Sequence, residues 1–220
     1  MSKLRLLFVK EGQASYISHL DLMRTFQRVF PRAELHLKHS NGFHPHPIIS
    51  IVLPLPVAQS SECELLDFET VEESNGVGVA EKLNTGMPAG IRVLDCYPIT
   101  RPVREFVYLK AEMELIYDKG VPSGAVEKLE ELFARETLII EKKTKHKAMA
   151  EVDVAPLIRE ISLTEGEGSI FAELTVCAQN PGLNPAYLAQ AITRELPELA
   201  PDFVRVRRKE LFDAEMNIFR

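Results

Sequence analysis

The sequence contains few cysteines, and they lie far apart. Cys63, Cys96 and Cys177 show neither CxxC nor CxxxCxxC spacing, which excludes the usual ligand patterns of iron–sulfur clusters and zinc knuckles. An odd, sparse cysteine count is typical of a reducing compartment, where each thiol is a small buried apolar side chain. We therefore expect a cytoplasmic protein that holds no cofactor.

Long apolar runs are also missing. No segment approaches the roughly 18 to 20 apolar residues that a membrane-spanning helix requires. The apolar run in the first residues, MSKLRLLFVKEG, is too short and too interrupted by charged residues for a signal peptide. We therefore expect no membrane partner. The 220 residues, 45% hydrophobic and 26% charged, fit an ordinary globular protein of one large or two small domains.

Catalytic signatures are absent as well. The chain lacks GxSxG, GxxxxGK[ST], GxGxxG and HExxH, so we predict a protein without catalytic residues of its own. The alternative is a metal-independent endoribonuclease in which His19, His44 or His46 acts as general acid or base, because histidine titrates near neutral pH.

Apolar periodicity divides the chain into two similar halves. Alternation predicts strands at residues 3–9, 35–38, 48–53, 64–71, 91–96, 107–117, 138–142, 170–177 and 203–211. Helical spacing predicts helices at residues 19–30, 76–83, 123–134 and 185–196. Pro31 is expected to end the first helix.

Each half therefore reads as βαββαβ. We predict an α+β fold of tandem ferredoxin-like units, with antiparallel sheets and helices on one face. The N-terminal lobe is expected at residues 1–97 and the C-terminal lobe at 105–220, joined by a linker at residues 97–102.

The start of the first helix is strongly marked. Ser18 is a good N-cap, and Asp21 lies three residues on, as in a capping box. His19, Arg24 and Arg28 either contact phosphate or a partner at this end, or belong to a solvated helix face with internal ion pairs.

A second feature is the segment from His39 to Pro47, HSNGFHPHP. Its prolines stiffen the backbone, so Asn41, Phe43, His44 and His46 would be displayed to stack on bases or to pack against a protein. The other interpretation is a rigid loop that supports the sheet edge. His39, His44 and His46 form an alternative metal site, although the loop offers no cysteine or carboxylate.

Positive charge is clustered despite a net charge of −6. Lys142, Lys143, Lys145 and Lys147 form a basic finger, which is either a solvated hairpin or a grip on a phosphate backbone. Arg205, Arg207 and Lys209 should point outward together, while Val204 and Val206 face the core. Glu151 and Asp153 are expected to face a lysine or arginine.

Several motifs resemble a known family. Phe8-Val-Lys10, the SHLDL sequence from Ser18 to Leu22, and Gly42-Phe-His-Pro-His-Pro47 are similar to those of the radical SAM-associated domain family. Members of this bacterial family occur beside or fused to a cobalamin-binding radical SAM protein. The resemblance implies a cytoplasmic partner of such an enzyme. It implies no activity for this chain. The chain lacks the three cysteines that bind the iron–sulfur cluster of a radical SAM enzyme.

Three functional hypotheses follow. The first is a substrate-recognition module that presents RNA or a ribonucleoprotein to a radical SAM enzyme. The second is the endoribonuclease that uses histidine. The third is a protein–protein adaptor that docks the radical SAM partner through the SHLDL helix and the proline-rich loop.

Overall fold

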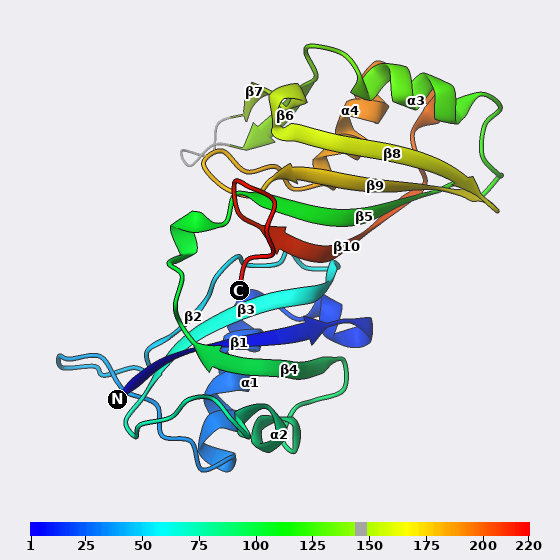
Figure 1. Cartoon of the computed structure of the whole chain (residues 1–220). Helices are drawn as coiled ribbons and strands as arrows, with labels where there is room; N and C mark the ends of the chain where they lie inside the picture. The colour runs from blue at the N-terminus through cyan, green and yellow to red at the C-terminus, as the bar shows by residue number, and fades with distance from the viewer. Residues whose placement is uncertain (144–148) are drawn as a thin grey trace. The chain divides into compact units, whose positions relative to one another are not determined.

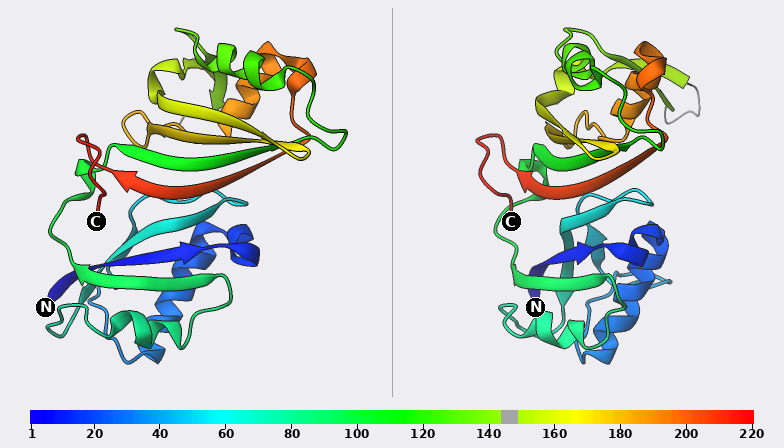
Figure 2. Two further views of the ribbon diagram at one scale, coloured as in Figure 1. Left: turned by 45° about the vertical axis from the view of Figure 1, so that its right-hand side comes forward. Right: turned by 90° about the vertical axis from the view of Figure 1, so that its right-hand side faces the viewer.

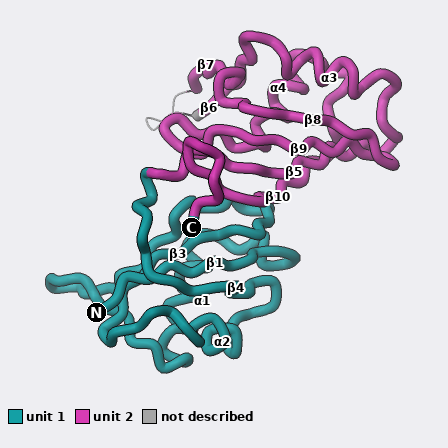
Figure 3. Tube along the Cα trace, viewed as in Figure 1, with its two compact units in different colours: residues 1–104, 220 teal, residues 105–219 magenta. Residues whose placement is uncertain are grey.

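The computed structural model describes residues 1–143 and 149–220. The chain divides into two compact units, residues 1–104 with Arg220 and residues 105–219 (Figure 3). Lys145 and Lys147 of the expected basic finger lie outside the described residues. Within these residues, none of the helices is long and apolar enough to cross a membrane.

Unit 1 has the ferredoxin-like order of elements (Figure 1). Along the chain these are β1 (Ser2–Lys10), α1 (His19–Arg32), β2 (Ile49–Ile51), β3 (Ser60–Thr70), α2 (Val79–Asn84) and β4 (Ile91–Pro98). The strands pair antiparallel in the order β4-β1-β3-β2. This arrangement of a βαββαβ unit confirms the predicted fold of the first half.

Alternation along β1 explains why the helices cover one face of this sheet. Leu4, Leu6 and Phe8 are fully buried and belong to one core with residues from both helices. The ring of Phe8 meets that of Phe26 on α1 edge to face, with centroids 5.0 Å apart. Such pairing adds to the free energy of burying aromatic side chains.

Unit 2 repeats this order with one insertion. Its elements are β5 (Tyr108–Ile116), α3 (Ala125–Phe133), β6 (Ile139–Lys143), β7 (Met149–Asp153), β8 (Ile158–Gly166), β9 (Ser169–Cys177), α4 (Tyr187–Glu195) and β10 (Phe203–Phe212). The sheet runs β10-β5-β9-β8, again antiparallel. Figure 2 shows α3 and α4 on the same face of it in both views.

Each unit carries a hairpin at the same point of the fold. In unit 2, β6 pairs with β7 between α3 and β8. In unit 1, residues 38–48 form a hairpin between α1 and β2, with a bridge from His39 to Pro47. Both hairpins therefore join the first helix of a unit to the second strand of its sheet.

The sequence-based prediction was wrong about the second strand of unit 2. Residues 138–142 were expected there, but they form β6 of the inserted hairpin, and the sheet strand is β8, which was not predicted. β8 lies at the edge of the sheet and contains charged and hydroxyl side chains. A register shift between Ile158 and Glu160 further breaks its alternation.

Smaller corrections concern unit 1. The first helix continues past Pro31 to Arg32. A proline in the last turn removes only one backbone hydrogen bond, so the helix can still include it. The strand expected at residues 35–38 is reduced to an isolated bridge between Leu37 and Thr70. β4 includes Tyr97 and Pro98, so the linker begins later than predicted.

Candidate functional site

The hairpin at residues 38–48 is held by a regular set of backbone hydrogen bonds. Ile48 N donates to Lys38 O, and Ser40 N donates to His46 O, both at 2.8 Å. Glu69 of β3 closes its base: Glu69 O accepts from Lys38 N at 2.8 Å, and Glu69 N donates to Ile48 O at 3.2 Å. The hairpin is thus fixed to the sheet and projects near the N-terminal end of β1 (Figure 1).

Side-chain contacts orient the histidines of this hairpin. Ser40 Oγ lies 2.9 Å from His46 Nδ1 and accepts from His46 N at 3.2 Å. His39 Nδ1 lies 3.0 Å from Leu37 O. Because a carbonyl oxygen can only accept, the proton of this bond is on His39 Nδ1.

The tip displays its side chains to solvent. Asn41, Phe43, His44 and His46 are all exposed, and the Phe43 side chain is 100% exposed. Gly42 has a φ of 124°, a conformation that favours glycine. An aromatic ring without intramolecular cover on an ordered hairpin is suited to contact a partner.

A cavity of about 430 Å³ lies beside the hairpin. Its lining comes from the hairpin, β1, β2, β3 and the segment after β4: Lys3, His46, Pro47, Ile48, Ile49, Ser50, Asp67, Phe68, Glu69 and Ile99. Sequence reasoning singled out only His46 and Pro47 among these, because the others come from separate strands. The available signal was the alternation that places Lys3, Asp67 and Glu69 on the face opposite the helices.

The carboxylates of this cavity are compensated by cations. Lys38 Nζ donates to Glu69 Oε2 at 2.8 Å, and Lys3 Nζ lies 3.7 Å from Glu69 Oε1. The hydrogen bond from Lys38 lowers the pKa of the Glu69 carboxyl, and the charges of Lys38 and Lys3 lower it further. Fully buried Arg5 binds both oxygens of Asp67, at 2.6 and 2.9 Å. A carboxyl group with a lowered pKa, as in Glu69, suits recognition better than proton transfer.

The predicted helix cap at Ser18 is confirmed. Ser18 Oγ accepts from Asp21 N at 3.2 Å and donates to Asp21 Oδ2 at 2.7 Å. Arg24 Nη1 lies 3.2 Å from Asp21 Oδ1. The Ser18 hydrogen bond, followed by that of Arg24, lowers the pKa of Asp21. The exposed cation Arg24 is therefore partly offset, while His19 and Arg28 are exposed on the same helix.

The structure separates this helix end from the hairpin. The chain enters α1 after Lys10, at the C-terminal end of β1. The hairpin is bonded to Glu69, which pairs with Lys3 near the N-terminal end of β1. Seven residues along β1 span roughly 23 Å. His19 therefore lies at the opposite end of unit 1 from His44 and His46. The histidines proposed as alternative catalytic residues are not brought together as a set.

A metal site at the hairpin is not supported. Among residues 1–143 and 149–220, no group of three or more His, Cys, Asp or Glu side chains is placed to hold a metal ion. Within the hairpin, His39 and His46 are instead bound through Nδ1 to Leu37 O and Ser40 Oγ.

The base of the predicted basic finger is tied to α4. Lys142 Nζ donates to Gly182 O at 3.4 Å and lies 5.6 Å from the ring centroid of Tyr187. Lys143 is the last residue of β6, and its backbone pairs with that of Met149. Of the predicted lysines, Lys142 is thus engaged within unit 2.

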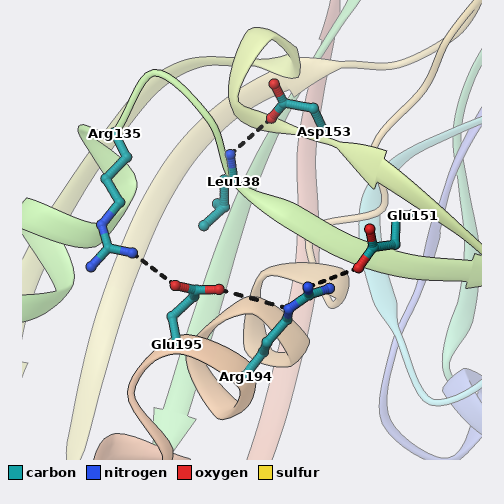
Figure 4. A network of polar contacts seen from close by, with 6 residues as sticks. All are labelled: Arg135, Leu138, Glu151, Asp153, Arg194 and Glu195. Carbon is teal, nitrogen blue, oxygen red and sulfur yellow. Dashed lines mark hydrogen bonds and ion pairs between the residues drawn. The ribbon is translucent and has the colours of Figure 1, made fainter.

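Figure 4 shows the polar network that fixes this hairpin. Arg194 Nη2 donates to Glu151 Oε1 at 2.8 Å, which confirms that Glu151 faces a cation and raises the pKa of Arg194. Arg135 Nη1 donates to Glu195 Oε2 at 2.9 Å. For Asp153 the expectation was wrong, since its Oδ1 accepts from Leu138 N and Ala155 N.

The arginines on the exposed face of β10 lie opposite glutamates of the neighbouring strand β5. Arg205 and Arg207 share a face, as predicted, but their register partners are Glu114 and Glu112. Arg205 Nη1 lies 3.2 Å from Glu114 Oε2, and Arg207 is only half exposed. Lys209 lies on this face too, because its Nζ is 3.2 Å from Oε1 of Glu112. Positive charge on this face is therefore offset locally.

These features define a class of protein, the tandem ferredoxin-like α+β proteins, with a hairpin inserted in each copy. The profile of one bacterial family matches residues 3–185, and the chain belongs to that family, described as an uncharacterized protein conserved in bacteria (DUF2344). No curated protein matches the chain.

One solved structure supports the fold. A chain in the "Crystal Structure of a Cbf5-Nop10-Gar1 Complex" has a TM-score of 0.51 at 9% identity, covering 94% of this chain and 48% of that chain. This chain thus spans about half the length of that neighbour. An unknown protein from Galdieria sulphuraria has a TM-score of 0.29 at 11% identity, covering 94% of this chain and 98% of that chain.

Proposed function

We propose that this chain is a non-catalytic recognition module of the cytoplasm that binds a protein partner through the hairpin at residues 38–48. The observation that carries the proposal is Phe43, fully exposed at the tip of a hairpin whose base is fixed by Glu69. Burying such a side chain contributes about 1.5–3 kcal/mol. That contribution becomes available when a partner covers the ring.

A radical SAM enzyme is the proposed partner. The SHLDL and GFHPHP motifs resemble those of the radical SAM-associated family, which supports this choice. Cys63 and Cys96 are buried within unit 1, so they are not presented to a cluster. The radical chemistry would therefore belong to the partner, and this chain would position its substrate or dock the enzyme.

The charges around the hairpin favour protein over RNA at this surface. Lys3 and Lys38 share the carboxylate of Glu69. RNA binding draws on uncompensated lysines and arginines that displace counterions from phosphates. Glu69 and Asp67 offset two of the three cations Lys3, Lys38 and Arg5, so the hairpin base keeps only one excess positive charge, whereas its aromatic tip suits a protein surface.

The test is direct binding to the radical SAM protein of the same host, purified separately. Phe43→Ala should weaken binding at least tenfold, as expected for an interface residue that contributes more than about 1.4 kcal/mol. Phe171→Ala, at a position 47% exposed in unit 2, is the matched control and should leave affinity unchanged. Equal affinity of the Phe43 variant and the native chain would refute the hairpin as the docking element.

RNA recognition is the second candidate, and Lys142 and Lys143 at the end of β6 favour it. They lead into the basic segment that contains Lys145 and Lys147. Charge reversal at Lys142, Lys143 and Lys145 should weaken retention of RNA or ribonucleoprotein and flatten its salt dependence. Retention with the same salt dependence after these changes would exclude the finger as an RNA contact.

A further inference from the structure

A larger cavity, of about 650 Å³, lies wholly within unit 2. Its walls are β6 on one side, α4 on another, and the turn from Pro201 to Val204 at the start of β10. It is separate from the docking hairpin, and none of the predicted site residues lines it. Its size is in the range of cavities that bind small ligands or side chains of a partner.

The wall at the start of β10 is anchored to the sheet. Tyr117 Oη donates to Leu199 O at 3.1 Å, and Asp118 N donates to Asp202 Oδ2 at 2.8 Å. Asp202 N in turn donates to Ile116 O at 2.9 Å. Asp202 is therefore fixed in place with a carboxylate at the cavity, and a fixed wall lowers the entropy lost on binding.

Another wall is formed by α4, and ion pairs of Arg194 fix it to the neighbouring hairpin. Arg194 binds Glu151 on β7 at 2.8 Å and lies 3.7 Å from Glu195 (Figure 4). Arg194 lines the cavity, but the carboxylates of Glu151 and Glu195, with a contribution from Glu141, offset its charge. It is therefore poorly placed to recruit an anionic ligand.

The remaining charges of the lining are negative. Glu141 of β6 and Asp202 before β10 both line the cavity, and both are exposed. A phosphate or carboxylate would be repelled by both. A cation would be attracted by both, in keeping with the acidic character of the whole chain.

The rest of the lining is largely apolar. Ile140, Pro201 and Val204 line the cavity together with Phe203, which is 51% exposed. The Phe203 ring lies on the same side of β10 as Arg205, whose Cζ is 6.0 Å from the ring centroid, whereas Val204 faces the opposite side of the strand. A surface of this composition matches a positive group carried on an aliphatic stem.

We propose that this cavity binds the guanidinium or ammonium group of an arginine or lysine side chain from a protein segment. The aliphatic stem packs on Pro201 and Val204, while Glu141 and Asp202 attract the charged group. This inference goes beyond the docking role of the hairpin, because it concerns another unit and a different chemistry.

The experiment is an NMR titration of the full chain with the peptide Ac-Ala-Arg-Ala-NH₂. Amide shifts should change around Glu141, on the exposed face of α4 and at residues 201–204. The same peptide with citrulline, which is isosteric and neutral, should bind at least fivefold more weakly. Equal binding of the citrulline peptide, or shift changes confined to other regions, would overturn the proposal.

Variants locate the charged group. Glu141→Gln and Asp202→Asn should each weaken binding about two- to fivefold, the range measured for exposed ion pairs. The amide oxygen introduced by Asp202→Asn can still accept from Asp118 N, so the wall is preserved in that variant. Glu165→Gln on β8, at the far edge of the sheet, is the matched control and should bind as the native chain does.

n-Butylguanidine distinguishes a protein segment from a free organic cation, since it carries a single guanidinium on an aliphatic stem without a backbone. Weaker binding of n-butylguanidine than of the peptide supports a protein segment as the source. Binding as tight as the peptide, with the same loss in Glu141→Gln, would overturn the segment and assign the cavity to a free organic cation.

Discussion

The side chain of Asn84 pairs with the backbone of Val93 in the way that a neighbouring strand would. Asn84 Nδ2 donates to Val93 O, and Asn84 Oδ1 accepts from Val93 N, both at 2.8 Å. Asn84 is the last residue of α2, and Val93 lies on β4 at the edge of the sheet. The helix thereby covers backbone groups of an edge strand that would otherwise be open to another chain.

Replacing Asn84 by Ala should lower the free energy of unfolding by about 1–3 kcal/mol, because a donor and an acceptor of Val93 lose their partners. Urea denaturation checks this value. Asn84→Asp keeps the acceptor and loses the donor. Its free energy of unfolding should therefore lie between that of the native chain and that of Asn84→Ala. A stability of Asn84→Ala equal to that of the native chain would show that water replaces both bonds.

Ser40→Ala should loosen the hairpin while leaving global stability nearly unchanged. The substitution removes the contacts of Ser40 Oγ with His46, worth about 0.5–1.5 kcal/mol. The amide of Ser40, which donates to His46 O, should exchange with solvent several-fold faster by hydrogen exchange. Ser50→Ala on β2 serves as the control. Unchanged exchange at Ser40 would mean that the backbone bonds alone hold the arms together.

Ser18→Ala should cost about 0.5–2 kcal/mol of stability through loss of the helix cap. It should also raise the pKa of Asp21, because the Ser18 hydrogen bond is the main cause of its lowering. A lowered carboxyl pKa in the folded state gives stability that is present above the ordinary carboxyl range and lost as the pH falls through it. Carboxyl NMR titration measures the shift, and Ser18→Thr should retain it.

At high pH the ionisation of β4 should destabilise the chain. Burial, with a contribution from Asp95, raises the pKa of Cys96 to about 12, and burial raises that of Tyr97 to about 12. A raised pKa gives stability that is complete below the ordinary value and lost as the pH rises toward 12. Alkaline denaturation followed by circular dichroism should therefore shift to higher pH in Tyr97→Phe, and an unshifted midpoint would contradict this.

The helices and central strands of this fold could be predicted because their sequence patterns are local. Ser18 begins α1 at the position that its side chain dictates, and the alternation along residues 107–117 identifies β5 without tertiary information. β8 could not be predicted in the same way, since an edge strand buries little of its length and Arg159 occupies a register shift. Because β8 was not recognised, residues 138–142 were predicted to be the second strand of the sheet.

The site residues also divide into those that local sequence can predict and those that only the fold brings together. Phe43, His44 and His46 are consecutive or nearly so, and their exposure follows from the prolines and glycine around them. The residues of the larger cavity come from β6, α4 and the start of β10, so Glu141 and Asp202 gain a relationship only through folding. The partners of the basic residues, such as Glu114 for Arg205, depend on strand register.

The two hairpins occupy one and the same connection in the repeated lobes, between the first helix and the second strand. Natural selection can therefore alter the length or composition of either insertion while the sheet order and core of its lobe stay constant. In this chain the connection of unit 1 carries an aromatic ring and histidines, and β6 of unit 2 ends in the lysines Lys142 and Lys143. Exchange of these insertions between relatives would transfer binding preference and leave the scaffold intact.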